Sequence, residues 1–463
     1  MLPSATSPRA TAEARTPATP TATIIGGGPA GLMAAEVLAR AGVAVTVYER
    51  MPSPGRKFLL AGHGGLNITH SEARESFVTR YGSSASRIAP MLEAFGPQDL
   101  RDWCDALGEP TFVGSSGRVF PQAFRATPLF RAWLASLDQL GVRIERRTAW
   151  SGWATSPDEA ASPDSADSPA DAPDASPADA LLLTDADGRT TQVASDVTIF
   201  ALGGASWPHL GADGGWVAPF QTRGVTVAPL RAANVGVRVD WAPIFSDRFA
   251  GTPLKNVSLT VRGPRGTSLN APVRGDAMLT KTGIEGGPVY AIGAAIRDAL
   301  DAATLNNASP GKRGRCVLEV DLRPDLTAGH LAERLQHRRP KDSASNWLRR
   351  SIGLDPASIG LLREAGGGAL PADATAMAAL IKAVPVVVTG TMPIDRAIST
   401  AGGIEWSEVD EHLMLHKLPG TFVAGEMLDW EAPTGGYLLQ ASFSMGVTAA
   451  NGALAWLGAG ATS

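Results

Sequence analysis

The chain has 463 residues, which is too long for a single hydrophobic core and predicts two or three domains. Hydrophobic residues make up 44% and charged residues 19%, which argues against a disordered or fibrous chain and favours a globular enzyme. A formal net charge of −4, without a dense lysine or arginine block, argues against nucleic acid or anionic lipid as a partner, so we expect a small-molecule substrate.

Only two cysteines occur, Cys104 and Cys316, and their wide separation indicates neither a disulfide framework nor a paired-thiol metal site. Two such cysteines favour a reducing, cytoplasmic setting. The sequence contains no uninterrupted apolar run of about 18 residues, so a membrane-spanning helix is not expected. The patterns do not indicate an oligomeric state.

The first ordered segment follows an extension, residues 1–20, that is rich in Ala, Thr, Pro and Ser and is expected to be disordered. The run TATII, from Thr21, predicts a strand, and PAGLMAAEVLARAG predicts a helix closed by Gly42. The segment VAVTVYER alternates valine with other residues and predicts a second, parallel strand. The three elements predict a βαβ unit of about 30 residues.

Residues 156–180 consist almost wholly of Ala, Ser, Pro and Asp, and they bury too little apolar surface to offset the entropy of ordering. We therefore expect a flexible surface loop. The flanking runs GVRIERRTAWSGW and ALLLTDADG predict strands of one small antiparallel element, so the loop interrupts a domain instead of separating two.

The rest of the chain predicts a discontinuous first domain. VTIFALGGASWP, after Asp196, predicts a buried strand that runs into glycines, which is typical of a parallel strand ending at a ligand crevice. Residues 225–325 predict a β-rich, barrel-like insertion, and residues 326–384 predict a small helical subdomain. Residues 385–463 are expected to rejoin residues 21–224. The fold class is α/β, with a discontinuous Rossmann-type domain.

The sequence GGGPAG places Gly26, Gly28 and Gly31 in the G-x-G-x-x-G spacing between the first strand and the first helix. These glycines suit a tight turn, close approach of a pyrophosphate, and packing of helix on strand. Glu49 ends the second strand, where a carboxylate can accept hydrogen bonds from a ribose, and Arg50 follows it near the expected adenosine. The motif predicts a dinucleotide site; the alternative is a glycine-rich turn without a ligand.

Two further glycine-rich segments are candidates for the same site. In PGRKFLLAGHGGLNITH, Arg56 and Lys57 precede a run of glycines and Asn67, and two cations with an amide suit a pyrophosphate and ring carbonyls. In GEMLDWEAPTGGY, Glu426 and Asp429 follow a strand, where one carboxylate can accept bonds from a sugar chain. The glycines that follow open a helix whose N–H groups can point at a ring.

Together these segments resemble the aminoacetone-oxidase-like, YhiN/BaiN-type family of bacterial FAD-binding flavoproteins. The resemblance covers nearly the whole ordered chain, and its motifs are the glycine fingerprint with Glu49, GRKFLLAGHGG (55–65), GRVFP (117–121), ALGGASWP (201–208), AGGI (401–404) and GEMLDWEAPTGGYLLQAS (425–442). It implies a discontinuous FAD domain, a barrel-like insertion and a small helical part, with FAD as the cofactor.

The resemblance and the motifs together assign the FAD contacts, among which the backbone near Trp150 is expected to meet the adenine. The assigned residues are Gly26, Gly28, Pro29, Ala30, Gly31, Glu49, Arg50, Arg56, Lys57, Gly64, Gly65, Leu66, Asn67, Trp150, Ala201, Leu202, Gly203, Gly204, Gly425, Glu426, Asp429, Gly435, Gly436, Tyr437 and Leu438.

The chain departs from the family at two places. Many relatives have Arg-Cys-Asn where this chain has Gly65-Leu66-Asn67, and Thr-His-Thr-Gly where it has Thr280-Lys281-Thr282-Gly283. Both places lie where a substrate would be sensed. The resemblance therefore supports the assignment of the cofactor more directly than it supports the assignment of an activity.

The family implies an FAD-dependent oxidoreductase that transfers a hydride between a small organic substrate and flavin, with amine oxidation by oxygen as one form. Two alternatives are an NAD(P)H-dependent reductase of an enone-like group and a non-catalytic flavin sensor. A single G-x-G-x-x-G disfavours a separate NAD(P)H domain, although NAD(P)H can still act as a transient reductant, and the lack of a cysteine pair excludes flavin disulfide reductases. The substrate-side candidates are Lys281, Tyr437, Trp430 and Arg118; no catalytic residue or metal ligand is assigned.

Overall fold

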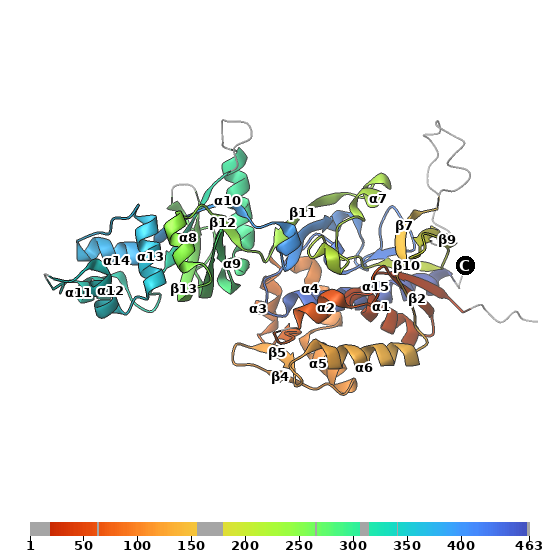
Figure 1. The fold of residues 1–463 in the computed structure, drawn as a ribbon. Helices are drawn as coiled ribbons and strands as arrows, with labels where there is room; N and C mark the ends of the chain where they lie inside the picture. The colour runs from red at the N-terminus through yellow and green to blue at the C-terminus, as the bar shows by residue number, and fades with distance from the viewer. Residues whose placement is uncertain are drawn as a thin grey trace, which may run out of the picture.

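The computed structural model describes residues 19–62, 64–154, 179–263, 266–305, 314–339 and 341–460. Three units follow one another along an elongated molecule (Figure 1). A Rossmann unit contains both ends of the described chain, a barrel unit lies in the middle, and a unit of four helices forms the far end. Most of the predicted N-terminal extension and residues 156–178 of the predicted loop lie outside the described residues.

A five-stranded parallel sheet organises the Rossmann unit. Its strand order is β19-β10-β1-β2-β6, and every neighbouring pair is parallel. The inner strands are short, mainly apolar runs, and β10 is buried along its whole length, as expected for a parallel sheet covered on both faces. The edge strand β6 is mostly charged and exposed. Their bounds are β1 Thr21–Ile25, β2 Ala44–Glu49, β6 Arg143–Arg146, β10 Val197–Phe200 and β19 Thr421–Val423.

Helix α1 (Pro29–Arg40) and the C-terminal helix α15 (Tyr437–Gly460) pack against each other beside this sheet. The two backbones approach closely because Gly446 has no side chain: a Cβ there would lie 2.4 Å from the carbonyl oxygen of Ala30. The predicted βαβ unit is confirmed, because β1 and β2 pair in parallel and α1 connects them. The other helices of this unit are α2 Arg56–Ala61, α3 Arg74–Thr79, α4 Ala85–Ala94, α5 Pro97–Ala106, α6 Ala126–Gln139 and α7 Val217–Thr222.

Three small antiparallel sheets complete the Rossmann unit. The predicted pairing across residues 156–180 is confirmed for β7, which pairs antiparallel with β8. It is wrong for the first part of the same flank, because β6 pairs parallel with β2 in the five-stranded sheet. The sheets are β7 (Ala149–Trp153), β8 (Leu181–Thr184) and β9 (Thr190–Val193); β3 (Thr69–His70), β5 (Arg118–Pro121) and β4 (Thr111–Val113); and β11 (Val227–Ala233) with β18 (Ser399–Ile404).

The expected β-rich insertion is a closed six-stranded barrel with the order β12-β15-β14-β13-β16-β17. Alternate residues of β16 are buried, so one face of the strand packs into the interior of the barrel. The strands are β12 Val237–Val239, β13 Pro253–Arg262, β14 Val273–Thr280, β15 Gly283–Glu285, β16 Cys316–Asp321 and β17 Val384–Thr391. Helices α8 (Pro243–Phe249), α9 (Gly287–Ala291) and α10 (Gly293–Leu305) accompany them.

The strand pairing divides the chain at points that differ from the predicted boundaries. Strand β17 closes the barrel, although its residues after 384 were expected in the Rossmann-type domain. Strand β11, expected in the insertion, pairs with β18 instead. An alternating apolar run has the same pattern whichever sheet it joins, so the sequence does not specify the partner strand.

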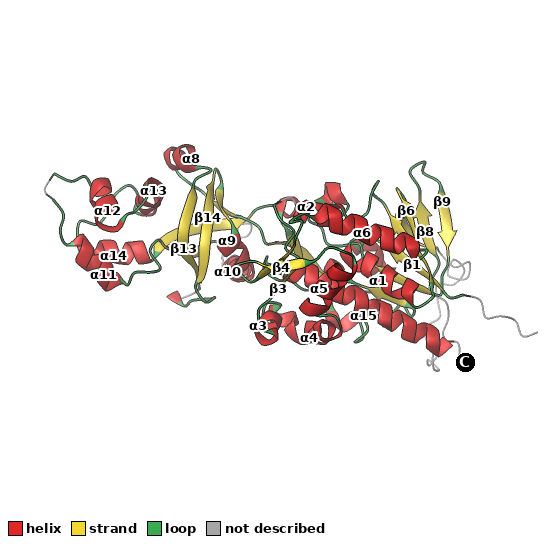
Figure 2. Cartoon of the chain, turned by 90° about the horizontal axis from the view of Figure 1, so that it is seen from below, coloured by secondary structure: helices red, strands yellow, loops and turns green. Residues whose placement is uncertain are grey.

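The helical unit consists of α11 (Ala328–Leu335), α12 (Ala344–Ile352), α13 (Pro356–Ala365) and α14 (Ala374–Lys382). Each begins with a side-chain N-cap from Thr327, Ser343, Asp355 or Asp373. Figure 2 shows strands β13 and β14 between this unit and the Rossmann unit. Among the described residues, no helix combines the length and the apolar character needed to cross a membrane.

Candidate functional site

A cavity of about 740 Å³ lies along the carboxyl edge of the parallel sheet. Residues that end or directly follow four of its strands line the cavity: Gly26 after β1, Glu49 at the end of β2, Ala201 after β10 and Ala424 after β19. This is the edge at which open α/β sheets bind ligands.

The N-terminus of α1 opens into the cavity through the glycine fingerprint. Gly26 has φ of 109°, and a Cβ there would lie 2.4 Å from the carbonyl oxygen of Ala201, so only glycine fits the turn. Gly28 is the N-cap residue, and a Cβ on it would meet nothing within 4 Å. The space beside Gly28 is therefore open, and the free N–H groups of the helix start can receive an anion there.

Glu49 is held in place at the side of this opening. Its Oε2 accepts a hydrogen bond from the N–H of Gly27 at 2.9 Å, and its Oε1 accepts one from the N–H of Met51 at 2.7 Å. Burial raises the pKa of Glu49, and the two backbone N–H donors oppose that rise. Each oxygen keeps a further lone pair, which suits bonds from ribose hydroxyls.

Two buried donors on the cavity wall have no partner in the described protein. These are Nε of Arg50 and Nε1 of Trp150, which both line the cavity. Buried N–H groups without a partner are costly, so the protein alone leaves two donors unsatisfied in residues at this end of the cavity.

A cover segment, residues 207–216, closes one side of the cavity near these donors. Trp207, which lines the cavity, has a left-handed backbone with φ of 60°. Asp213 pairs with Arg50 at 2.7 Å between Oδ2 and Nη1, and the indole of Trp216 donates to the carbonyl of Gly203 at 2.8 Å. The sequence motifs include only the first two residues of this segment, at the end of ALGGASWP, although the glycine cluster in GADGGW is a signal for an unusual backbone.

A hydrogen-bond network joins four segments at the middle of the cavity. Oε2 of Glu426 accepts from Nζ of Lys57 at 2.7 Å and from the N–H of Gly204 at 3.3 Å, and Oε1 accepts from the N–H of Thr400 at 2.8 Å. Lys57 also donates to Oγ of Ser206 at 2.6 Å. Glu426 thus holds α2, the turn after β10 and strand β18 together around the cavity.

The glycine-rich loop presents Asn67 to the opposite end of the cavity. Its Nδ2 donates to the carbonyls of Thr69 at 2.8 Å and Val119 at 3.1 Å, which fixes the amide. The side-chain oxygen is left as an acceptor that is not bonded to any described protein group. Asn67, Gly65 and Arg118 line this end.

Tyr437 is turned away from the cavity. Its hydroxyl donates to Oε1 of Glu72 at 2.6 Å, and its ring stacks on His70 with centroids 5.5 Å apart. Burial, together with the bond to Glu72, raises the pKa of Tyr437. Its backbone position, directly after two glycines that line the cavity, does not bring the side chain into the site.

The structure brings most of the predicted cofactor residues to one cavity. Those that line it are Gly26, Gly28, Pro29, Ala30, Glu49, Arg50, Arg56, Lys57, Gly65, Asn67, Trp150, Ala201, Leu202, Gly203, Gly425, Glu426, Gly435, Gly436 and Leu438, with the substrate-side candidates Arg118 and Trp430.

Other predicted residues lie outside the cavity lining, namely Gly31, Gly64, Leu66, Gly204, Asp429, Tyr437 and Lys281. Gly31 packs behind the fingerprint, where a Cβ would lie 2.1 Å from the carbonyl of Gly26. Leu66 is fully buried in the core. Asp429 is half-buried, and burial raises its pKa. Lys281 is exposed between β14 and β15 of the barrel.

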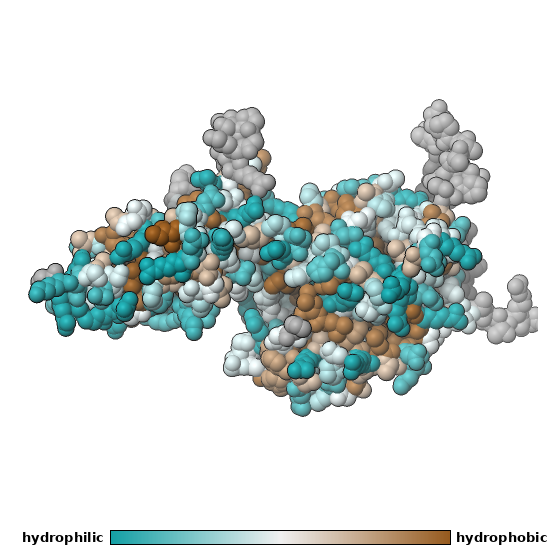
Figure 3. Space-filling model, viewed as in Figure 1, coloured by the Kyte–Doolittle hydropathy of each residue, from teal (hydrophilic) through white to brown (hydrophobic). Residues whose placement is uncertain are grey.

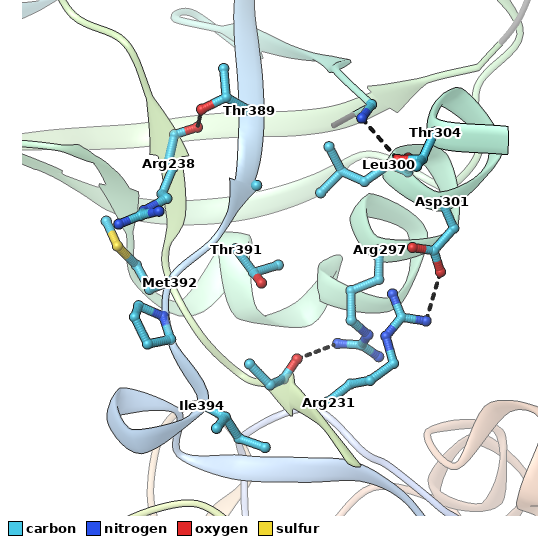
Figure 4. Close-up of a pocket in the computed structure, with 14 residues that line it drawn as sticks. Arg231, Arg238, Arg297, Leu300, Asp301, Thr304, Thr389, Thr391, Met392 and Ile394 are labelled. Carbon is cyan, nitrogen blue, oxygen red and sulfur yellow. Dashed lines mark hydrogen bonds and ion pairs between the residues drawn. The ribbon is translucent and has the colours of Figure 1, made fainter. Parts of the chain in front are cut away.

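A second cavity, of about 510 Å³, lies where the chain passes between the Rossmann and barrel units (Figure 4). Arg231 pairs with Asp301 there at 2.7 Å. The buried Arg297, on α10, donates to the carbonyl of Ala232 at 3.0 Å and to both carboxylate oxygens of Glu431. Glu431 follows Trp430, so this ion pair connects the barrel unit to a wall of the first cavity.

The donors and the shape of the first cavity fit the FAD that the sequence resemblance implies. The open space at Gly28 suits the pyrophosphate, Glu49 suits a ribose, and the unpartnered donors of Arg50 and Trp150 suit the adenine end. Asn67 supplies an acceptor at the other end. Among the described residues, no cluster of three or more His, Cys, Asp or Glu side chains could hold a metal ion.

Comparison with known proteins agrees with this interpretation. A family model described as the HI0933-like protein Rossmann domain matches residues 20–452. A 3-dehydro-bile acid Δ(4,6)-reductase of Clostridium scindens is 24% identical over 442 residues, which cover 93% of this chain and 98% of the relative. A ribosomal RNA dihydrouridine synthase of Escherichia coli is 22% identical over 435 residues, which cover 91% and 95%.

Solved structures also match across most of the chain. The 3-ketosteroid Δ1-dehydrogenase of Sterolibacterium denitrificans aligns with a TM-score of 0.49 at 13% identity, and the alignment covers 94% of this chain and 100% of the other.

Proposed function

Because the chain belongs to the HI0933-like family of FAD-binding Rossmann proteins and is an FAD-dependent oxidoreductase, we propose that it moves a hydride between a small organic substrate and FAD held in the first cavity. The observation that carries the proposal is the cavity itself. It joins the open helix start at Gly28 to the glycine-rich loop at Asn67 and to Gly435 and Gly436 along one continuous lining.

The residues of the protein bind and orient the cofactor and the substrate. The start of α1 would hold the pyrophosphate, Glu49 would hold a ribose, and Arg50 with the region of Trp150 would hold the adenosine. Lys57 and Glu426 fix the middle of the site, and the backbone at Gly435 and Gly436, which lines the cavity, would hold the ring. FAD bound in this cavity would supply the redox chemistry, which is hydride exchange with the substrate.

The candidate hydride donors fall into two classes. The family resemblance favours a small amine, with oxygen reoxidising the protein. The bile-acid reductase among the relatives favours an enone-like group as the acceptor. In this alternative we propose NAD(P)H as the reductant. A non-catalytic sensor is the third alternative, and it requires that every donor reduces the protein slowly.

The test is an anaerobic titration of the FAD-loaded protein with NADPH, NADH and small amines, followed by the visible flavin spectrum. Bleaching by an amine and recovery with oxygen supports the oxidase. Bleaching by NADPH or NADH and recovery with an enone supports the reductase. If no donor in the series bleaches the protein, the proposed hydride transfer is wrong and the sensor becomes the better hypothesis.

A further inference from the structure

We propose that the mouth of the FAD cavity binds an amphipathic substrate, whose flat apolar body lies on an aromatic platform and whose anionic oxygen group meets Arg118. The aromatic platform consists of Phe112, Phe120 and Phe124. The inference rests on the proposed function, because it names the substrate class for the same cavity.

The aromatic platform is an exposed cluster of rings that pack mainly on one another. Phe112 and Phe120 are opposite each other in the β4–β5 register, with ring centroids 5.8 Å apart and planes 29° apart. Phe124 lies 5.0 Å from Phe120 and 6.3 Å from Phe112. Phe112 is 39% exposed and Phe124 46%. Contiguous exposed apolar surface of this kind marks binding sites.

The platform is continuous with the cavity. A Cβ on Gly65, which lines the cavity, would lie 2.5 Å from the ring of Phe124, so the ring and the loop backbone are in contact. Leu60 also lines the cavity and is 38% exposed. Figure 3 shows apolar residues gathered on this face of the Rossmann unit.

Phe124 holds its exposed position at a conformational cost. Its φ is 57°, in the left-handed region that bulky residues rarely adopt. Its N–H donates to the carbonyl of Pro121 at 2.8 Å, and its carbonyl accepts from the N–H of Leu66 at 3.4 Å. The turn therefore keeps a large ring beside the glycine-rich loop instead of burying it, and strain of this kind concentrates at ligand sites.

Arg118 adds a positive charge at the junction of the platform and the cavity. It precedes Phe120 by two residues on β5, so both side chains extend from the same face of the strand. It lines the cavity, and no described residue pairs with its guanidinium. By contrast, Arg50 and Lys57 in the same cavity are paired with carboxylates. Arg56, which also lines the cavity, acts on Glu49, where burial raises the pKa of the carboxyl and the charge of Arg56 opposes that rise. A free guanidinium next to an apolar face suits a ligand with a carboxylate or another anionic oxygen.

The experiment uses the oxidised, FAD-loaded protein and two probes, 2-naphthoate and 2-naphthalenemethanol, which share a flat ring system but differ in charge. Binding is measured from the change in the visible flavin spectrum on titration. We expect 2-naphthoate to bind more tightly than the alcohol. Arg118→Gln weakens naphthoate binding about tenfold and leaves the alcohol unaffected, because one charge-assisted bond is lost. Phe112→Ser weakens both probes, because the platform is reduced.

Two variants on exposed positions elsewhere are matched controls. Arg87→Gln removes an exposed cation from α4, and Ile244→Ser removes a side chain that is 82% exposed on α8. Both controls should bind the probes as the unaltered protein does. Equal FAD content in every variant shows that folding and cofactor binding are intact.

The proposal is overturned if neither probe perturbs the flavin spectrum, or if Arg118→Gln binds naphthoate as tightly as the unaltered protein. It is also overturned if a short single-stranded RNA displaces naphthoate from the platform, since stacked nucleobases would then be its ligands. No electron transfer is measured, so a protein that no donor reduces can still bind the probes. Failure of this inference and failure of the proposed function are therefore distinguishable.

Discussion

Gly28 is the residue on which the anion site at the start of α1 depends most directly. The space where its Cβ would lie is open, so an aspartate there fits without a clash in the protein but occupies the position of a pyrophosphate. Its negative charge would also take the place of the anion at the helix start.

We therefore expect Gly28→Asp to purify without FAD, as measured by the absorbance ratio of flavin to protein. The matched control is Gly287→Asp, at the start of α9, where a Cβ also meets nothing within 4 Å. That variant should keep its FAD. A yellow Gly28→Asp protein with unchanged affinity would contradict the assignment of this helix start.

Lys57 and Glu426 form an ion pair in which both side chains are largely shielded, at 29% and 16% exposure. Lys57→Met leaves Glu426 with its backbone donors alone, and we expect a loss of about 1–3 kcal/mol in the free energy of unfolding. Urea unfolding of the FAD-free and FAD-loaded protein measures the change. Arg74→Met is the control, since Arg74 and Glu93 are 55% and 71% exposed and such pairs contribute about 0–1 kcal/mol. Equal losses in the two variants would show that the network does not stabilise the cavity.

At the scale of elements, the cover segment is held over the cavity by the Arg50–Asp213 pair, which is partly exposed. We expect Asp213→Asn to release FAD several-fold faster while changing the free energy of unfolding by less than about 1 kcal/mol. Release is followed by gel filtration after dilution. Asp179→Asn provides the comparison, because the Arg223–Asp179 pair has similar exposure but does not line the cavity. The same release rate in both variants would mean that the cover segment does not retain the cofactor.

The sequence predicted elements whose signals are local. The βαβ unit follows from apolar runs and from glycines at fixed spacing, and the barrel from alternating runs. Most of the cover segment was missed because an isolated apolar residue such as Leu210 is usual in a core. The Lys57–Glu426 pair joins positions 369 residues apart, so no spacing indicates it. Tyr437 was expected at the site because it follows two glycines, but Gly436, with φ of 97°, turns the chain and the ring packs beside Glu72 instead.

At the scale of the whole molecule, the described residues provide one continuous cavity for the cofactor and a mouth at Arg118 for reactants. Donor and acceptor then meet the flavin in turn, and we expect ping-pong kinetics. Stopped-flow mixing with the donor alone should bleach the flavin, and the acceptor added alone should restore the colour. Reduction that requires both reactants together would contradict this order and favour a separate site for one of them, for which the second cavity beside Arg297 is the candidate.

The closed barrel and the four helices occupy one continuous stretch of chain, residues 237–391, whereas strand β19 of the parallel sheet lies at residues 421–423. During synthesis from the N-terminus, the whole inserted part therefore emerges before the sheet that surrounds it in sequence can be completed. Domains generally fold as units as they leave the ribosome. The barrel and its helices should reach their native form first. The parallel sheet that contains β1, β2 and β10 cannot be completed until β19 has been synthesised. The cofactor cavity, which needs residues from both sides of the insertion, is then the last part of the protein to form.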